Sequence, residues 1–282
     1  MRNVAVIGAG TMGAGIAQMY ANAEHTVLLI DVDEHKLEQG LQTIGTSLQR
    51  LVAREKVTAA YKRSVLDRIR TSSDYTQLRE SDLVVEAATE KDSIKRQILR
   101  DVERCVDESA IIATNTSSLS ITGLAAAISR QERFIGMHFF NPVPVMPLVE
   151  LIRGLRTSDE TYETAKRMMG QLGKVVVSVD DSPGFVVNRL LIPMINEAFA
   201  VWAEGISSPE DIDRGMKLGA NHPLGPLALA DLIGLDVCLS IMNALHDQFG
   251  DGKYRPSVQL RKLVAAGRLG RKTGQGVFDY RT

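Results

Sequence analysis

The 282-residue chain has few of the features that mark secreted, membrane-bound or nucleic-acid-binding proteins. Its two cysteines, Cys105 and Cys238, form no metal-binding spacing and no disulfide framework, and both lie in amphipathic helical patterns that predict buried thiols. The formal net charge of −1 gives no reason to expect binding to nucleic acid or to a membrane surface. No apolar run approaches the length of a membrane span, and the N-terminus enters a predicted strand at once. We therefore expect a cytoplasmic protein without a metal centre.

The N-terminal segment carries a glycine pattern that is typical of dinucleotide binding. A short apolar run at residues 4–7 predicts a buried strand, and a G-x-G-x-x-G turn and a helical pattern at 14–23 follow it. In this motif the first glycine permits a tight turn, the second lets the backbone approach a pyrophosphate, and the third lets helix and strand pack closely. The helix N-terminus offers N–H groups to the phosphates. We expect six residues to contact the cofactor: Gly8, Ala9, Gly10, Thr11, Met12 and Gly13.

An acidic residue stands where such a fold binds a ribose. The apolar run 26–30 ends in Asp31, at about the twenty-residue spacing where a carboxylate accepts hydrogen bonds from ribose hydroxyls. The same carboxylate repels a 2′-phosphate, and Val32 and Asp33 supply no arginine to reverse that preference. The sequence therefore favours NAD over NADP.

Strand-like and helix-like segments alternate through the first two-thirds of the chain, which predicts an α/β fold with a mostly parallel, Rossmann-type sheet. Two successive helical patterns, 34–55 and 59–68, predict an inserted helical pair. Beyond Ser182 every pattern is helical. We therefore expect an NAD-binding domain over residues 1–182 and an all-α domain over 183–282, whose surplus of apolar residues favours a subunit contact. Further strands are expected at 83–87, 110–114, 134–140, 148–152 and 174–179.

Polar residues follow five predicted strands at the edge where open parallel sheets bind ligands. These groups are the glycine turn, Asp31, residues 86–90, residues 115–118, and His138 with Asn141. An enzyme that oxidises an alcohol with a nicotinamide cofactor needs a base that titrates near the working pH. Histidine, with a reference pKa of about 6.5, meets that need.

His138 is the candidate base among five histidines, because it interrupts the apolar run 134–140, whereas His25 and the other three lie in surface or turn patterns. Glu150 likewise interrupts the apolar run 148–152. If the two strands are neighbours, this carboxylate can face the imidazole, fix its tautomer and stabilise the imidazolium. A core histidine bonded to backbone, or an ion pair with a purely structural role, is the alternative.

Several motifs together carry a specific resemblance. They are the glycine turn, Asn115-Thr116-Ser117-Ser118, His138-Phe139-Phe140-Asn141-Pro142, Pro183-Gly184-Phe185-Val186-Val187-Asn188-Arg189, Leu224-Gly225-Pro226-Leu227-Ala228-Leu229-Ala230-Asp231 and Gly270-Arg271-Lys272-Thr273-Gly274. Over essentially its whole length the chain resembles the L-3-hydroxyacyl-CoA dehydrogenases, most of all their short bacterial members that act on 3-hydroxybutyryl-CoA. The resemblance implies a homodimer that uses NAD to oxidise (S)-3-hydroxyacyl-CoA reversibly to 3-oxoacyl-CoA.

The resemblance also implies roles for single residues. His138 would be the general acid/base and Glu150 its orienting partner, while Ser117 and Asn188 would hold the substrate. Further cofactor contacts are implied for Glu90, Lys95, Asn115, Ser117, Asn141 and Lys272. Contacts with coenzyme A are implied for Ser47 and, more loosely, for Arg54, which stands where relatives often have lysine.

Two other classes of function stay open from sequence. One is oxidation of a free 3-hydroxy acid, a sugar acid or carnitine on the same scaffold. The lysine-based β-hydroxyacid dehydrogenases are a weaker fit, because His138 with Glu150 suits a histidine mechanism better. The other class is a non-enzymatic NAD(H)-sensing protein, which would be expected to have lost His138, Glu150 or Asn188, whereas all three are present.

Overall fold

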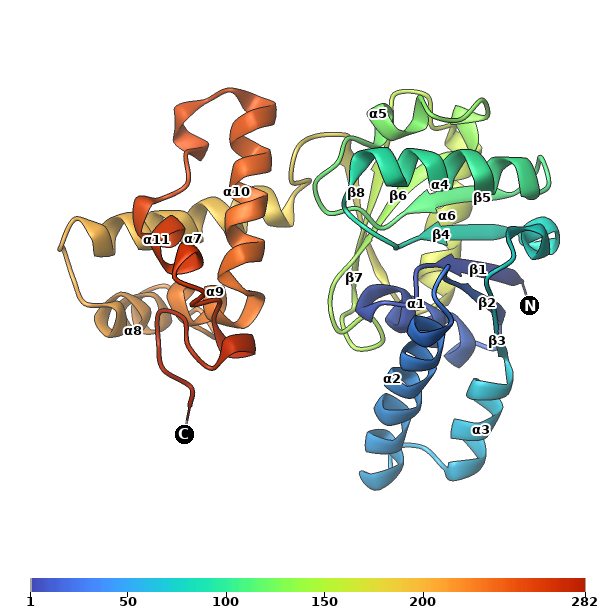
Figure 1. Cartoon of the computed structure of the whole chain (residues 1–282), viewed down its shortest axis with the longest axis horizontal. Coiled ribbons are helices and arrows are strands. Elements are labelled where there is room, and N and C mark those ends of the chain that lie inside the picture. Colours follow the sequence, from blue (N-terminus) through green and yellow to red (C-terminus); the bar gives the residue numbers. More distant parts are fainter. Residues whose placement is uncertain (1, 282) are drawn as a thin grey trace. The chain divides into compact units, whose positions relative to one another are not determined.

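The structure, a computed structural model, describes residues 2–281, and the chain divides between Ser182 and Pro183 into two compact units (Figure 1). The first unit contains an eight-stranded sheet in the order β3-β2-β1-β4-β5-β6-β7-β8, and the second is helical. This arrangement confirms the predicted fold class, a mostly parallel Rossmann-type sheet followed by a helical region.

The sheet is parallel from β3 to β6, whereas β7 and β8 run in the opposite direction. The apolar runs form its strands, because side chains buried on both faces suit a sheet that helices cover on both sides. The strands are β1 (Asn3–Ile7), β2 (Thr26–Ile30), β3 (Ile69–Ser72), β4 (Leu83–Glu86), β5 (Ile111–Thr114), β6 (Phe134–Phe139), β7 (Leu148–Arg153) and β8 (Val175–Asp180).

Strand β3 is the one strand that the sequence patterns do not predict. Its four residues, Ile-Arg-Thr-Ser, form no apolar run, and only Ile69 among them is buried. The reason is its position at the edge of the sheet, where it pairs with β2 alone.

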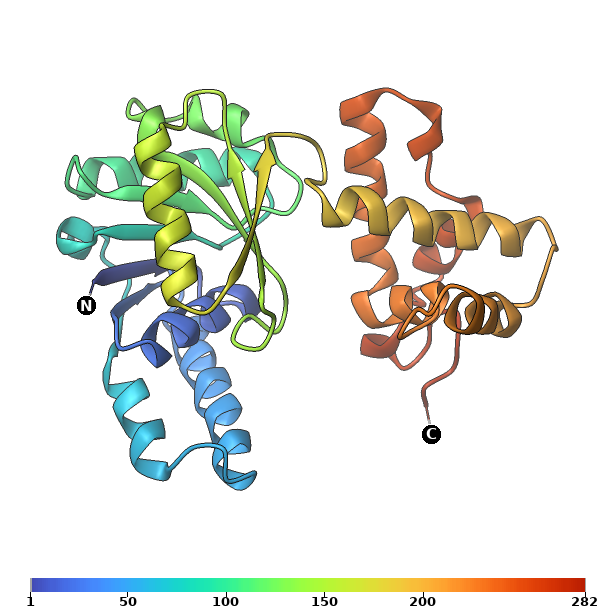
Figure 2. The same ribbon diagram turned by 180° about the vertical axis from the view of Figure 1, so that it is seen from behind.

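Helices cover both faces of the sheet. Helices α1 (Thr11–Asn22) and α6 (Asp159–Gln171) share one apolar core with the strands. Helices α4 (Asp92–Cys105) and α5 (Ile121–Ala125) lie over the face opposite α6, as Figures 1 and 2 show. Between β2 and β3 the chain forms α2 (Glu34–Ala53) and α3 (Ala59–Asp67), which pack side by side and form the expected helical pair.

The second unit has an apolar core of its own, to which five helices contribute. Helix α8 begins where the capping pattern predicts, since the Ser208 side chain accepts a hydrogen bond from Asp211 N and Pro209 is the first helical residue. The helices are α7 (Val187–Ala203), α8 (Pro209–Gly219), α9 (Pro226–Ile233), α10 (Leu235–Phe249) and α11 (Val258–Ala265).

Among residues 2–281, no single helix has the length and apolar composition needed to cross a membrane. Helices α9 and α10 meet that criterion only when taken together, and the chain bends by 98° between them.

Two side chains differ from the exposure predicted for them. Cys238 is buried as expected, but Cys105, at the end of α4, is only half-buried. His25 is half-buried rather than exposed, because its ring packs edge-on against the buried Tyr20. Burial lowers the pKa of the His25 imidazole.

Candidate active site

Strands β6 and β7 bring a histidine and a glutamate together inside the first unit. His138 lies directly opposite Glu150 in the antiparallel register, and its Nδ1 atom is 2.7 Å from Glu150 Oε2. The His138 side chain is 8% exposed and that of Glu150 is completely buried. A buried carboxylate requires a charged or hydrogen-bonding partner, and Nδ1–H of His138 provides one. With its proton on Nδ1, the neutral imidazole carries the basic lone pair on Nε2.

His138 lines a cavity of about 290 Å³ beyond the carboxyl ends of β4, β5 and β6. Strand ends place the other polar groups of this cavity, and Asn115 is oriented there because its Oδ1 atom accepts a hydrogen bond from Phe139 N. The structure thus gathers several residues predicted from sequence around one space: Met12, Glu90, Lys95, Asn115, Ser117 and His138.

The glycine turn has the shape that a dinucleotide requires. Gly8 has φ of +100°, and a Cβ atom there would lie 2.6 Å from Ala88 Cα. At Gly13 a Cβ atom would lie 1.8 Å from the carbonyl oxygen of Gly8, so helix α1 packs against the turn without room for a side chain. A Cβ atom at Gly10 would meet nothing within 4 Å, which leaves open space beside a helix N-terminus that no side chain caps. These residues fit a bound pyrophosphate.

Asp31 lies at the end of β2 in a fixed orientation. Its Oδ2 atom accepts a hydrogen bond from Ala9 N at 2.9 Å, and its Oδ1 atom accepts one from Asp33 N at 3.2 Å. The residue is 9% exposed. Each carboxylate oxygen can accept a further hydrogen bond, so the group fits the ribose hydroxyls of NAD.

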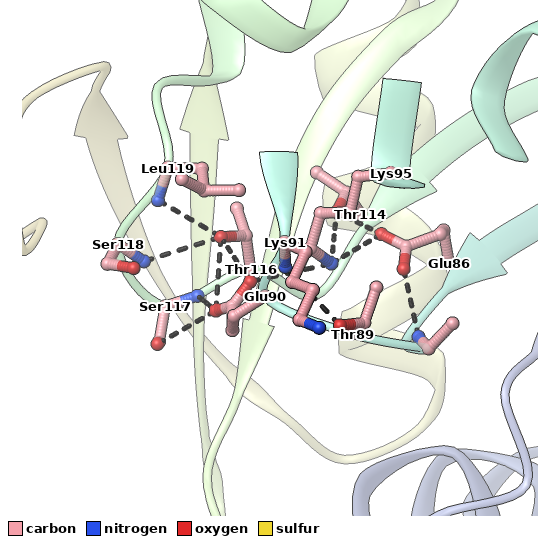
Figure 3. Close-up of polar contacts among 11 residues, drawn as sticks. Glu86, Thr89, Glu90, Lys91, Lys95, Thr114, Thr116, Ser117, Ser118 and Leu119 are labelled. Carbon is pink, nitrogen blue, oxygen red and sulfur yellow. Dashed lines mark hydrogen bonds and ion pairs between the residues drawn. The ribbon is translucent and has the colours of Figure 1, made fainter. Parts of the chain in front are cut away.

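A cluster of three charged groups lies beside the same cavity (Figure 3). Lys95 Nζ is 2.6 Å from Glu86 Oε2 and 3.6 Å from Glu90 Oε2. The Glu90 carboxylate also accepts hydrogen bonds from the Ser117 amide and hydroxyl and from the Thr116 hydroxyl. This network ties the segment after β4 to the segment after β5.

The sequence analysis includes Glu86 and Thr116 in the polar segments at this edge of the sheet but predicts no individual role for either residue. Glu86 gave a signal that could have been used, because it is a single charge inside the apolar run 83–87, as Glu150 is in its own run. Thr116 gave none, since a hydroxyl in a Thr-Ser-Ser segment indicates no particular partner.

A groove of about 630 Å³ lies along α1, α2 and the segment after β6, and Ser47 and Asn141 both line it. Arg50 also lines this groove and is its only charged lining residue among those that the structure describes. Arg54 does not, because α2 ends at Ala53 and Arg54 is its exposed C-terminal cap. The structure therefore brings Ser47 together with Arg50, which sequence reasoning missed.

Lys174 fixes the segment that joins β6 to β7. Its Nζ atom donates hydrogen bonds to the carbonyl oxygens of Val143 and Met146, each at 2.6 Å. Burial lowers the pKa of this ammonium group. The clamp holds the connection between the strands of His138 and Glu150.

Asn188 and Lys272 belong to the second unit. Asn188 lies in the first turn of α7, and the Lys272 ammonium pairs with both carboxylate oxygens of Asp236 at the start of α10. Their predicted contacts with substrate and cofactor stay predictions.

Each of the two units matches the model of a known protein domain. The model of the NAD-binding domain of 3-hydroxyacyl-CoA dehydrogenase matches residues 3–182, and that of the C-terminal domain matches residues 184–280. The chain belongs to the 3-hydroxyacyl-CoA dehydrogenase family. As a 3-hydroxyacyl-CoA dehydrogenase it is an NAD-dependent oxidoreductase, which confirms the predicted cofactor and class of enzyme.

Individual relatives match this dehydrogenase over its full length. The 3-hydroxybutyryl-CoA dehydrogenase of Bradyrhizobium diazoefficiens is 51% identical, with 100% of this chain and 96% of the relative covered. That of Clostridioides difficile is 48% identical, with 98% of this chain and 99% of the relative covered. The crystal structure of (S)-3-hydroxybutyryl-CoA dehydrogenase from Ralstonia eutropha superimposes with a TM-score of 0.96 at 56% identity and covers 100% of each chain.

The glycine turn supports a paired prediction. Gly13→Ala places a methyl group on the Gly8 carbonyl, so we expect a loss of about 1–3 kcal/mol in unfolding free energy without cofactor. Gly10→Ala has room for its methyl group, so stability should be unchanged while NADH affinity falls, because the methyl group occupies the space for the pyrophosphate. Denaturant unfolding and NADH fluorescence titration measure both effects. Wild-type NADH affinity in Gly10→Ala would contradict the assignment.

Proposed function

We propose that this dehydrogenase interconverts (S)-3-hydroxybutyryl-CoA and acetoacetyl-CoA with NAD. The observation that carries the proposal is the His138–Glu150 pair, 2.7 Å apart, at the wall of the cavity that Ser117 and Asn115 also line. The names of the full-length relatives support the choice of a four-carbon acyl group.

His138 acts as general base in the direction of oxidation. Its Nε2 atom takes the proton of the substrate 3-hydroxyl, and Glu150 stabilises the imidazolium that results. In reduction the imidazolium returns the proton to the 3-oxygen. NAD+, when bound, would supply the hydride acceptor, and the glycine turn and Asp31 would hold its pyrophosphate and ribose.

Ser117 and Asn188 hold the substrate in this proposal. The Ser117 hydroxyl lines the cavity and donates a hydrogen bond to Glu90 Oε1 at 3.0 Å. By rotating away from Glu90, this hydroxyl would donate to the substrate 3-oxygen instead. Asn188 is proposed as a further substrate contact, and Asn141 and Lys272 as further cofactor contacts.

We place the coenzyme A portion of the substrate in the groove that Ser47 lines. The only charged lining residue there among those described is Arg50, and a guanidinium group suits the phosphates of coenzyme A. Arg54, one turn further along, would reach only the outer end of the ligand. A free 3-hydroxy acid has no phosphate for this groove, which distinguishes the proposal from the alternative substrate class.

We further propose that the second unit forms a homodimer contact. It exposes several large apolar side chains, including Leu190, Leu218 and Val258, which are 69%, 80% and 65% exposed. Light scattering on purified protein measures the mass directly. The cytoplasmic location stays a prediction.

The direct test of the function is NADH consumption with three substrates. We expect reduction of acetoacetyl-CoA, weaker reduction of acetoacetyl-pantetheine through a higher KM, and no measurable reduction of acetoacetate. Faster turnover of acetoacetate than of the thioesters would overturn the proposed substrate class.

Replacing the base gives a second prediction. His138→Gln keeps a hydrogen-bonding group beside Glu150 but removes the proton acceptor, so kcat should fall by about 10²–10⁴-fold while NADH binding and thermal stability stay unchanged. Stopped-flow or steady-state NADH oxidation measures the rate, and circular dichroism checks the fold. Near-normal turnover would remove His138 from the mechanism.

Replacing Glu150, the partner of His138, gives a third prediction. Glu150→Gln deprives the imidazolium of a buried counter-charge, so kcat should fall, but less than in His138→Gln. The pH dependence of alcohol oxidation should also shift, because the imidazolium loses its buried counter-charge. The pH–rate profile measures this shift, and an unchanged profile would argue against the pairing.

Arg50 gives a fourth prediction, with Arg54 as the matched control. Arg50→Gln should raise the KM for acetoacetyl-CoA about tenfold, the loss expected for a charge-assisted hydrogen bond, and leave kcat and the KM for acetoacetyl-pantetheine unchanged. Arg54→Gln should have a smaller effect on either substrate. Equal effects of Arg50→Gln on both thioesters would contradict phosphate recognition.

A further inference from the structure

The proton-transfer pair does not account for the charged cluster on the other side of the cavity. Figure 3 shows Glu86, Lys95 and Glu90 as one connected group, with Thr114 beside Glu86 and Ser117 beside Glu90. Two carboxylates share one ammonium in this cluster, so its net charge is −1. Glu86 and Lys95 are 0% and 2% exposed, whereas the side chain of Glu90 is 45% exposed and lines the cavity.

The distances decide which carboxylate the ammonium neutralises. Lys95 Nζ is 2.6 Å from Glu86 Oε2 but 3.6 Å from Glu90 Oε2. Glu86 is held further by the Thr114 hydroxyl at 2.7 Å and by the Ala88 amide at 2.9 Å. The buried ion pair is therefore internally compensated, and the excess negative charge lies on Glu90 at the cavity wall.

The two forms of the cofactor respond differently to such a charge. The nicotinamide ring of NAD+ is a cation, and that of NADH is neutral. A negative charge at the cavity wall attracts the cationic ring through its Coulomb interaction and has little effect on the neutral ring. Hydrogen bonds and apolar contacts around the ring have no comparable preference for one form.

We propose that the Glu86–Lys95–Glu90 cluster sets the relative affinity of the enzyme for NAD+ and NADH, with its excess negative charge favouring the oxidised form. The inference rests on the proposed function, which puts the nicotinamide ring in the cavity beside His138. Glu86 acts here as a positioning residue. By holding Lys95 at its own carboxylate, it prevents the ammonium from neutralising Glu90.

The test is the ratio of two dissociation constants, Kd for NAD+ divided by Kd for NADH. NADH is titrated by its fluorescence, and NAD+ by displacement of NADH. We expect Glu90→Gln to raise the ratio on the order of tenfold, because it removes the charge at the cavity wall. Glu86→Gln should raise it similarly, because Lys95 then pairs with Glu90 and the cluster becomes neutral.

Glu103 offers a matched control in the same unit. Its carboxylate accepts hydrogen bonds from the amide and hydroxyl of Ser129, as that of Glu90 does from Ser117, but it does not line the cavity. Glu103→Gln should therefore leave the ratio unchanged.

The outcomes separate an electrostatic role from a structural one. If Glu90→Gln merely loosens the Ser117 segment, both affinities fall together and the ratio stays constant, which would overturn the proposal. Because the Glu90 side chain is 45% exposed, this variant tests the proposal even if Glu86→Gln does not fold. Wild-type protein that binds neither form of the cofactor would overturn the proposed function itself.

Discussion

The buried contact between His138 and Glu150 is the constraint on which the rest of the site depends. A wholly buried carboxylate is costly unless a partner compensates it, so the fold must keep the imidazole within hydrogen-bond distance. The reversal of direction between β6 and β7 meets this requirement, because it sets the two residues opposite each other. The Lys174 clamp on the connecting segment supports the same register. The buried His138–Glu150 contact therefore requires β6 and β7 to be adjacent strands of the sheet.

Around this pair, helix dipoles, carboxylates and a guanidinium group are positioned for different parts of the proposed ligands. Backbone N–H groups at the start of α1 face the space for the pyrophosphate, and Asp31 fits the ribose. Glu90 carries negative charge to the cavity beside His138, whereas Arg50 supplies positive charge in the groove. In the proposed function, the pyrophosphate and ribose of the cofactor therefore meet helix dipoles and a carboxylate, whereas the phosphates of coenzyme A meet the guanidinium group of Arg50.

Much of this arrangement can be predicted from the sequence, for identifiable physical reasons. The glycine turn can be predicted because Gly8 and Gly13 stand where a Cβ atom would collide with the backbone of neighbouring residues. His138 and Glu150 can be predicted as site residues because each is a single polar residue inside an apolar run. Glu86 gives the same signal, and its partner Lys95 lies on a helix, where no strand pattern indicates the pairing.

Other features depend on where a residue lies in the folded chain, and local sequence patterns carry no information about that position. The edge strand β3 buries one side chain and so lacks an apolar run. Ser47, Arg50 and Arg54 all lie toward one side of a helical pattern, and only the end of α2 at Ala53 decides which arginine lines the groove. The half-buried state of Cys105 likewise depends on its place at the last residue of α4.

A crystal structure of the enzyme with NAD+ and acetoacetyl-CoA tests the central claim most directly. The account predicts His138 Nε2 at about 3 Å from the substrate 3-oxygen, with Nδ1 still bonded to Glu150. An imidazole turned away from the thioester, or a 3-oxygen that contacts other groups with His138 out of reach, would contradict it.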